Sequence, residues 1–246
     1  MLFSYKILGT LLAEGDVMTT GVLCIHGFTG GPQELKPFVD FLKQNTDWLV
    51  LVPTLSGHGE ELHLENYKAE HWLMDAELAY KKLAKEVDVV IVVGFSMGGL
   101  IALYLALRYE VEKLVLLSAA AKYISVRQLL KDIKELTNDL FHGELEQNEL
   151  YHRYDNKISN VPMSSTLEFL RLVRKVEPYY EKITVPICIV QGEVDGIVPA
   201  ITAQFLYDRL GSTKKQLILS PNGKHHICFS DDREEWFQSV LNFLLE

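Results

Sequence analysis

Short apolar runs rich in β-branched residues alternate with amphipathic stretches along most of the chain. The runs that predict strands are Val22 to Ile25, Trp48 to Val52, Val87 to Val93, Lys113 to Leu117, Ile187 to Gln191 and Gln216 to Leu219. Nearly continuous apolar character of this kind is typical of strands buried on both faces, as in a parallel sheet. The segment from Tyr5 to Leu12 predicts an additional, antiparallel edge strand.

Helical patterns with one apolar stripe separate these predicted strands. The first has Leu35, Phe38, Val39 and Leu42 at helical spacing, after a Gly-Gly-Pro opening that favours a helix start. The segment from Gly98 to Tyr109 is apolar nearly all round, so we expect it to be the most deeply buried helix. Regular alternation of strand and helix predicts right-handed crossovers and a doubly wound, mostly parallel sheet, in a single α/β domain over residues 1–246.

Residues 122–182 break this alternation, with helical patterns, charged gaps and no strand pattern. An insertion of this length between two strands is more typical of a functional element than of a connector. We therefore expect a small helical cap over the site. The alternative is a helical subdomain with no role in catalysis.

Composition narrows the class of protein. The 246 residues are 48% hydrophobic and 23% charged, which is typical of a globular protein, and the net charge of −9 argues against nucleic acid or an anionic membrane as partner. The apolar stretches are shorter than a membrane span, and residues 1–15 show no signal-peptide pattern. The three cysteines form no disulfide framework, so we expect a soluble, cytoplasmic protein.

The sequence Gly94-Phe95-Ser96-Met97-Gly98 lies directly between a predicted strand and the most apolar helix. A GxSxG turn in that context is typical of a nucleophile elbow, which exposes the serine hydroxyl on a tight turn beside a helix N-terminus. The competing interpretation is a glycine-rich turn of another doubly wound protein. Phosphate-binding patterns such as GxxxxGK[ST] and GxGxxG do not accompany it, so we interpret Ser96 as the nucleophile.

A glycine-rich loop, His26 to Gly31, follows an earlier predicted strand. Acyl transfer passes through an oxyanion that needs two converging backbone N–H donors. We predict the amide of Met97, which follows the nucleophile, as one donor and the amide of Phe28 in this loop as the other.

A serine nucleophile also needs a base and an acid that orients it, in the chain order serine, acid, histidine. Asp195 follows a buried strand and precedes a turn, which favours it over the competing Glu193. Two adjacent histidines, His225 and His226, follow the last predicted strand, and only one of them can reach Ser96. The residues alone leave that choice open.

Together these segments resemble the bacterial carboxylesterases and monoacylglycerol lipases of the α/β-hydrolase superfamily. The segments that carry the resemblance are His26 to Gly30, Pro53 to Gly59, Gly94 to Gly99, Gly192 to Asp195 and the C-terminal histidines. In that family an acidic residue follows the catalytic histidine by five positions, and Asp231 fits this register for His226. The resemblance thus favours His226, although Lys224 stands where relatives tend to have a small residue, and His225 remains the alternative.

The resemblance further implies the α/β-hydrolase fold and hydrolysis of small carboxylic esters with a hydrophobic acyl group, through an acyl-enzyme and without a cofactor. It places the cap over the acyl pocket, and Met163, Leu167, Leu170 and Val173 are our candidates for its lining. No spacing of ligands predicts a metal site. The alternatives are acyl transfer to an alcohol, another reaction of the same triad, or a noncatalytic binding protein.

Overall fold

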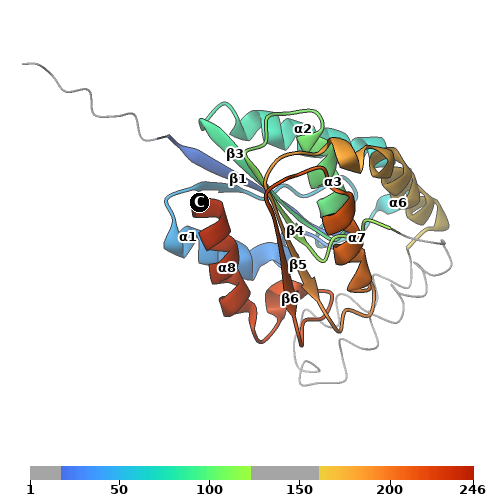
Figure 1. Ribbon diagram of the computed structural model, residues 1–246. Helices are drawn as coiled ribbons and strands as arrows, with labels where there is room; N and C mark the ends of the chain where they lie inside the picture. Colours follow the sequence, from blue (N-terminus) through green and yellow to red (C-terminus); the bar gives the residue numbers. More distant parts are fainter. Residues whose placement is uncertain (1–17, 123–160) are drawn as a thin grey trace, which may run out of the picture.

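The computed structural model describes residues 18–122 and 161–246, which contain a six-stranded sheet in the order β2-β1-β3-β4-β5-β6 (Figure 1). Its strands are β1 (Thr20–Ile25), β2 (Leu49–Leu51), β3 (Val89–Phe95), β4 (Lys113–Leu117), β5 (Ile187–Gly192) and β6 (Lys215–Ser220). Every neighbouring pair is parallel. The carboxyl ends of all these strands therefore lie at one edge of the sheet, as the predicted doubly wound architecture requires.

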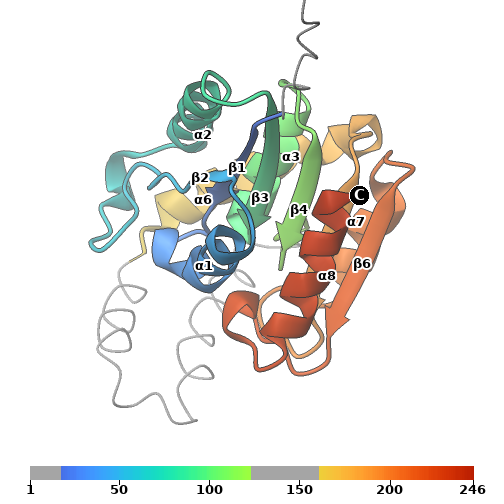
Figure 2. The same ribbon diagram turned by 90° about the vertical axis from the view of Figure 1, so that its left-hand side faces the viewer.

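Helices cover both faces of the sheet. One face carries α1 (Lys36–Asn45) and α8 (Arg233–Leu245), which lie in front of the strands in Figure 2. The other face carries α2 (Ala69–Leu83), α3 (Met97–Ala106) and α7 (Ile201–Arg209), and α6 (Met163–Val176) packs against α2 and α3. Short 3-10 turns complete the described elements: η1 (Pro32–Leu35), η2 (Leu64–Asn66), η3 (Glu177–Lys182) and η4 (Ile227–Phe229).

Alternating residues of each central strand enter different cores. In β1, Leu23 and Ile25 face the core under α2 and α3, whereas Val22 and Cys24 face the core under α1 and α8. This alternation follows from the two-residue period of a strand, and burial on both faces explains why the runs are apolar without interruption.

The helix predicted to be most deeply buried is α3, and the structure confirms this. It lies between the sheet and α6, and its residues from Met97 to Leu103 are all buried. No helix in the described part of the chain combines the length and the apolar character that crossing a membrane requires.

The prediction that the strands are buried on both faces is wrong for the two edge strands, β2 and β6. Leu49 in β2 is 47% exposed and Leu219 in β6 is 44% exposed, because each of these strands has a neighbour on one side only. The predicted strand from Tyr5 to Leu12 lies outside the described residues. Of the predicted cap at 122–182, residues 123–160 also lie outside them, and the described remainder forms α6 and η3.

Candidate active site

Ser96 occupies the tight turn between β3 and α3. Its backbone has φ 53° and ψ −117°, a conformation that is strained for a residue with a side chain. Hydrogen bonds hold it there: the Ser96 amide donates to the Leu117 carbonyl at 2.9 Å, and the Ser96 carbonyl accepts from the amides of Gly99 and Ala120. The turn thereby places the Ser96 hydroxyl at the carboxyl edge of the sheet.

Two glycines make this turn sterically feasible. A Cβ on Gly94 would lie 2.2 Å from the carbonyl oxygen of Gly98, and a Cβ on Gly98 would lie 2.1 Å from the carbonyl oxygen of Ile25. Both obstacles are backbone atoms, so neither can move unless β1 or α3 moves. The spacing of the GxSxG pattern thus has a direct steric cause in this fold.

His225 connects the serine to a carboxylate. Its Nε2 lies 3.0 Å from Ser96 Oγ, and its Nδ1 lies 2.9 Å from Asp195 Oδ2. All three residues are buried. With the proton on Nδ1, the ring donates to Asp195 and presents Nε2 as the acceptor for the Ser96 hydroxyl, which is the geometry of a base poised on a nucleophile.

The prediction of His226 as the partner of Ser96 requires correction. The Nε2 atom of His226 lies 3.1 Å from Oε1 of Glu34, a residue of η1, which follows the loop after β1. The rings of His225 and His226 are inclined at 78° with centroids 5.9 Å apart, so adjacent imidazoles point to different loops. The register to Asp231 was a poor guide because η4 begins immediately after His226 and sets the course of that segment.

Asp195 is held as a carboxylate by several donors. Its Oδ1 accepts from the amides of Ile197 at 2.8 Å and Val198 at 2.9 Å, while Oδ2 accepts from Gln191 Nε2 at 2.9 Å and from His225. Burial works to raise the pKa of Asp195, but the charge and hydrogen bond of His225 and the amides of Val198 and Ile197 outweigh it and lower the pKa below 3.8.

Sequence reasoning missed Gln191, although a lone polar residue near the end of an apolar strand was a signal. Its side chain is buried, and its Nε2 also donates to the carbonyl of Val198 at 3.0 Å, which closes the turn around Asp195. Glu193, the competing acid, is exposed. The structure therefore favours Asp195 over Glu193, as the sequence did.

One predicted oxyanion donor, Met97, belongs to the serine turn, and the other, Phe28, belongs to the loop after β1. Met97 is the first residue of α3, so its amide has no carbonyl acceptor within the helix. Phe28 follows β1, and no backbone carbonyl among residues 18–122 and 161–246 accepts a hydrogen bond from its amide. The next residue, Thr29, has φ 67°, which gives this loop its sharp turn. Their role as donors remains a prediction.

A buried carboxylate that the sequence analysis did not single out supports the same loop. Glu34 Oε2 accepts a hydrogen bond from the Gly27 amide at 2.9 Å, and Oε1 contacts His226. Burial works to raise the pKa of Glu34, but the hydrogen bond and charge of His226, the charge of His26 and the Gly27 amide together lower it. A Cβ on Gly30 would lie 2.1 Å from Glu34 Oε2, so glycine leaves room for this carboxylate.

Two further histidines have structural positions in the loops around Phe28. The Leu55 amide donates to His26 Nε2 at 3.0 Å, so His26 Nδ1 carries the proton and donates to the Gly27 carbonyl. The ring of His58 packs edge-on against Phe28 and Trp72. Burial lowers the pKa of His58 to about 3, which keeps this ring neutral.

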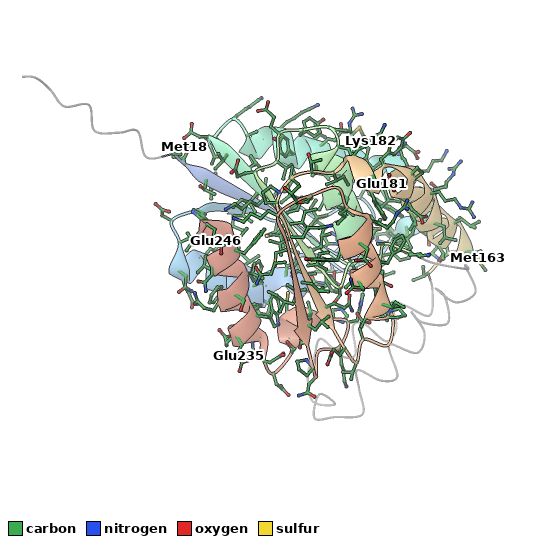
Figure 3. The ribbon with its side chains drawn as sticks, in the orientation of Figure 1. Met18, Met163, Glu181, Lys182, Glu235 and Glu246 are labelled. Atoms are coloured by element: carbon green, nitrogen blue, oxygen red, sulfur yellow. The ribbon has the colours of Figure 1, made fainter. Side chains whose placement is uncertain are left out.

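The four candidates for an acyl pocket separate into two groups on α6. Leu170 and Val173 are buried in the core shared with α3. Met163 is 57% exposed and lies at the outer end of α6 (Figure 3), and Leu167 is 48% exposed. The residue of α6 that reaches the loop after β1 is instead Phe169, whose ring stacks on Phe28 with centroids 5.6 Å apart. A lining role for the four remains a prediction.

The described residues give little support to a cysteine nucleophile or to a metal site. Cys24, Cys188 and Cys228 are free and buried, and burial raises the pKa of Cys24 and of Cys188 to about 12, so these thiols are poor nucleophiles. Among residues 18–122 and 161–246, no three side chains of His, Cys, Asp or Glu are grouped to hold a metal ion.

Comparison with known proteins finds one matching family and several similar hydrolases. Residues 18–232 match a family described as serine aminopeptidase, S33. The chain is 26% identical over 227 residues to a thermostable monoacylglycerol lipase of Bacillus sp. (strain H-257), covering 91% of this chain and 89% of that protein. It is 23% identical over 227 residues to a carboxylesterase of Bacillus subtilis (strain 168), covering 91% of each.

Among solved structures, a metagenome-derived lipolytic enzyme of the LipS and LipT pair superposes with a TM-score of 0.73. It is 23% identical to this chain, and the match covers 93% of this chain and 94% of that one. This likeness confirms the predicted α/β-hydrolase fold.

Proposed function

Since this chain belongs to the serine aminopeptidase, S33, family, as the match over residues 18–232 shows, we propose that it is a serine hydrolase of carboxylic esters. The observation that carries the proposal is the unbroken chain of hydrogen bonds from Ser96 through His225 to Asp195. The names of its relatives, a monoacylglycerol lipase and a carboxylesterase, support the choice of ester over other acyl substrates.

In the proposed mechanism, His225 Nε2 takes the Ser96 proton while Ser96 Oγ attacks the ester carbonyl. The resulting imidazolium is stabilised by the Asp195 carboxylate, whose lowered pKa keeps it ionised at neutral pH. The amides of Phe28 and Met97 bind the oxyanion. His225 then gives its proton to the departing alcohol oxygen, which leaves an acyl group on Ser96.

Water completes the cycle. His225 removes a proton from the water as its oxygen attacks the acyl carbonyl, and the proton then returns to Ser96 Oγ as the carboxylic acid leaves. Every atom comes from the ester, the water or the protein side chains, so the proposed reaction needs no cofactor.

The proposed substrate is a small ester with a hydrophobic acyl group. Support comes from the apolar side chains of α6, with Phe169 stacked on Phe28 beside the loop that carries a proposed oxyanion donor. We place the cap, residues 122–182, over this acyl group. The buried, free cysteines suit a reducing compartment, so the proposal includes a cytoplasmic location.

A fluorophosphonate probe and p-nitrophenyl esters of increasing acyl length test the proposal. We expect the wild type to be labelled and to release p-nitrophenol. Ser96→Ala should lose both properties while its circular dichroism spectrum and thermal unfolding match the wild type. An unlabelled wild type would instead indicate a noncatalytic binding protein.

A competing alcohol separates hydrolysis from acyl transfer. An acyltransferase would form a new ester with added short-chain alcohols and would release less free acid, whereas the proposed hydrolase should release free acid in proportion to p-nitrophenol. Turnover retained by Ser96→Ala would contradict the assignment of the nucleophile.

A further inference from the structure

The Glu34 carboxylate lies between the two loops that the proposed mechanism depends on. One of its oxygens accepts a hydrogen bond from the Gly27 amide at 2.9 Å, directly before Phe28. The other lies 3.1 Å from the imidazole of His226, directly after His225. A single side chain thus connects the loop of the proposed oxyanion donor to the loop of the proposed base.

Burial of the Glu34 carboxylate costs free energy unless a charged or hydrogen-bonding partner compensates for it. Its side chain is 5% exposed and that of His226 is 15% exposed, so both are largely removed from water. A buried carboxylate is tolerated when it is paired and hydrogen-bonded, and removing its partner leaves an uncompensated charge. Gly30 leaves space for the carboxylate, which a Cβ there would contact at 2.1 Å.

We propose that Glu34 and His226 are a positioning pair that fixes the distance between the oxyanion donors and the base. This inference rests on the proposed function and adds two residues to which the proposed mechanism assigns no bond-making step. The pair acts through its neighbours in the chain: Glu34 holds the His26–Gly27 peptide, which directly precedes the Phe28 amide, and His226 orients the backbone that carries His225.

A positioning role has a distinctive kinetic signature. The oxyanion exists in the transition state and not in the bound ester, so a displaced donor lowers kcat and leaves KM nearly unchanged. Loss of a well-placed oxyanion donor lowers kcat by about 100- to 1,000-fold, and a displaced donor should cost less, about 10- to 100-fold.

Three variants test the pair. Glu34→Gln removes the charge and keeps the size, and His226→Leu removes the ring donor. His226→Gln is the conservative variant, because its amide N–H can replace the Nε2 donor toward Glu34. Glu65→Gln and His63→Gln are matched controls, since Glu65 is exposed and the His63 side chain is 73% exposed.

The measurements are kcat and KM for a p-nitrophenyl ester, normalised to sites titrated with a fluorophosphonate, and inhibition by a trifluoromethyl ketone. That ketone forms an anionic adduct on a serine, so its affinity reports on the oxyanion site independently of the amount of folded protein. We expect Glu34→Gln and His226→Leu to lower kcat and ketone affinity together by about 10- to 100-fold. His226→Gln should retain most of both.

The double variant tests whether the two residues act as a unit. Glu34→Gln combined with His226→Leu should be no worse than the more damaging single variant, because the connection is already lost. Additive losses, or a normal kcat per titrated site in Glu34→Gln, would overturn the pair. If the wild type hydrolysed no ester, the proposed function would fail first, and the pair would fail with it.

Discussion

His225 and His226 are adjacent in the chain, yet each imidazole contacts a carboxylate on a different loop. His225 Nδ1 lies 2.9 Å from Asp195, and His226 Nε2 lies 3.1 Å from Glu34. The same dipeptide thus takes part in the proposed catalytic chain and in the support beneath it.

Replacing His225 should remove the proposed general base and nearly all ester hydrolysis, whereas a conservative replacement of His226 should leave most of the activity. We expect His225→Gln to lower kcat/KM by about 1,000-fold or more, because a glutamine cannot accept the Ser96 proton. His226→Gln should lose less than about tenfold, since it retains a donor toward Glu34. Steady-state kinetics with p-nitrophenyl butyrate measures both. The reverse order of damage would restore His226 as the base and contradict the geometry described above.

The acid can be identified by a matched pair of amide substitutions. Asp195→Asn should lower kcat by about 1,000- to 10,000-fold, because the neutral amide no longer stabilises the imidazolium. Glu193→Gln, two residues earlier on an exposed side chain, should stay within about twofold of the wild type. Comparable losses in both variants would show that the loop as a whole, and not the Asp195 carboxylate, is required.

Gly98→Ala should destabilise the turn that carries Ser96. Its Cβ would lie 2.1 Å from the Ile25 carbonyl oxygen, so β1 and α3 would have to separate, at a cost of at least about 2 kcal/mol in the free energy of unfolding. Gly196→Ala is the control, since a Cβ there meets nothing within 4 Å. Urea denaturation of the three proteins gives the comparison. Equal stability of Gly98→Ala and the wild type would contradict the tight packing of this turn.

Stability should fall as the pH is lowered from 7 to 5.5, partly because of His58. The pKa of His58 is lowered from 6.5 to about 3 in the folded protein, so between these values the unfolded chain binds one more proton. The free energy of unfolding therefore decreases with falling pH, by about 1 kcal/mol over this interval for one such group. The lowered pKa values of Asp195 and Glu34 belong to a more acidic window, below about 4.5.

The measurement is urea denaturation at both pH values. His58→Leu should lose about 1 kcal/mol of this pH dependence, while His63→Leu, at a side chain that is 73% exposed, should keep it. The buried His26, whose pKa is also lowered, contributes with the same sign, so a remainder should persist. An unchanged pH dependence in His58→Leu would show that folding does not lower the pKa of His58.

Local patterns predicted much of the fold and the central site. The GxSxG turn defined Ser96 because its requirement for glycines is steric and local to one strand and one helix. Asp195 could be placed because parallel strands present their carboxyl ends at one edge. These features depend on short-range sequence, which a single chain displays directly.

The remainder depended on orientation, which sequence spacing does not determine. A choice between His225 and His226 requires the direction of each side chain across a turn, and the family register pointed to the wrong one. Glu34 was missed because its partner His226 lies 192 positions away in the chain. A similar limit applies to α6. The sequence showed its apolar stripe, but it did not show which of these side chains other elements of the fold would bury.

The stacking of Phe28 on Phe169 connects the loop of a proposed oxyanion donor to α6. We expect that an acyl group bulky enough to displace α6 would also displace Phe28 through this stacking. Such an ester would bind more weakly, because its acyl chain needs more space, and it would react more slowly, because the Phe28 amide would be displaced from its carbonyl oxygen. Discrimination between long and short tails would then appear in turnover as well as in affinity.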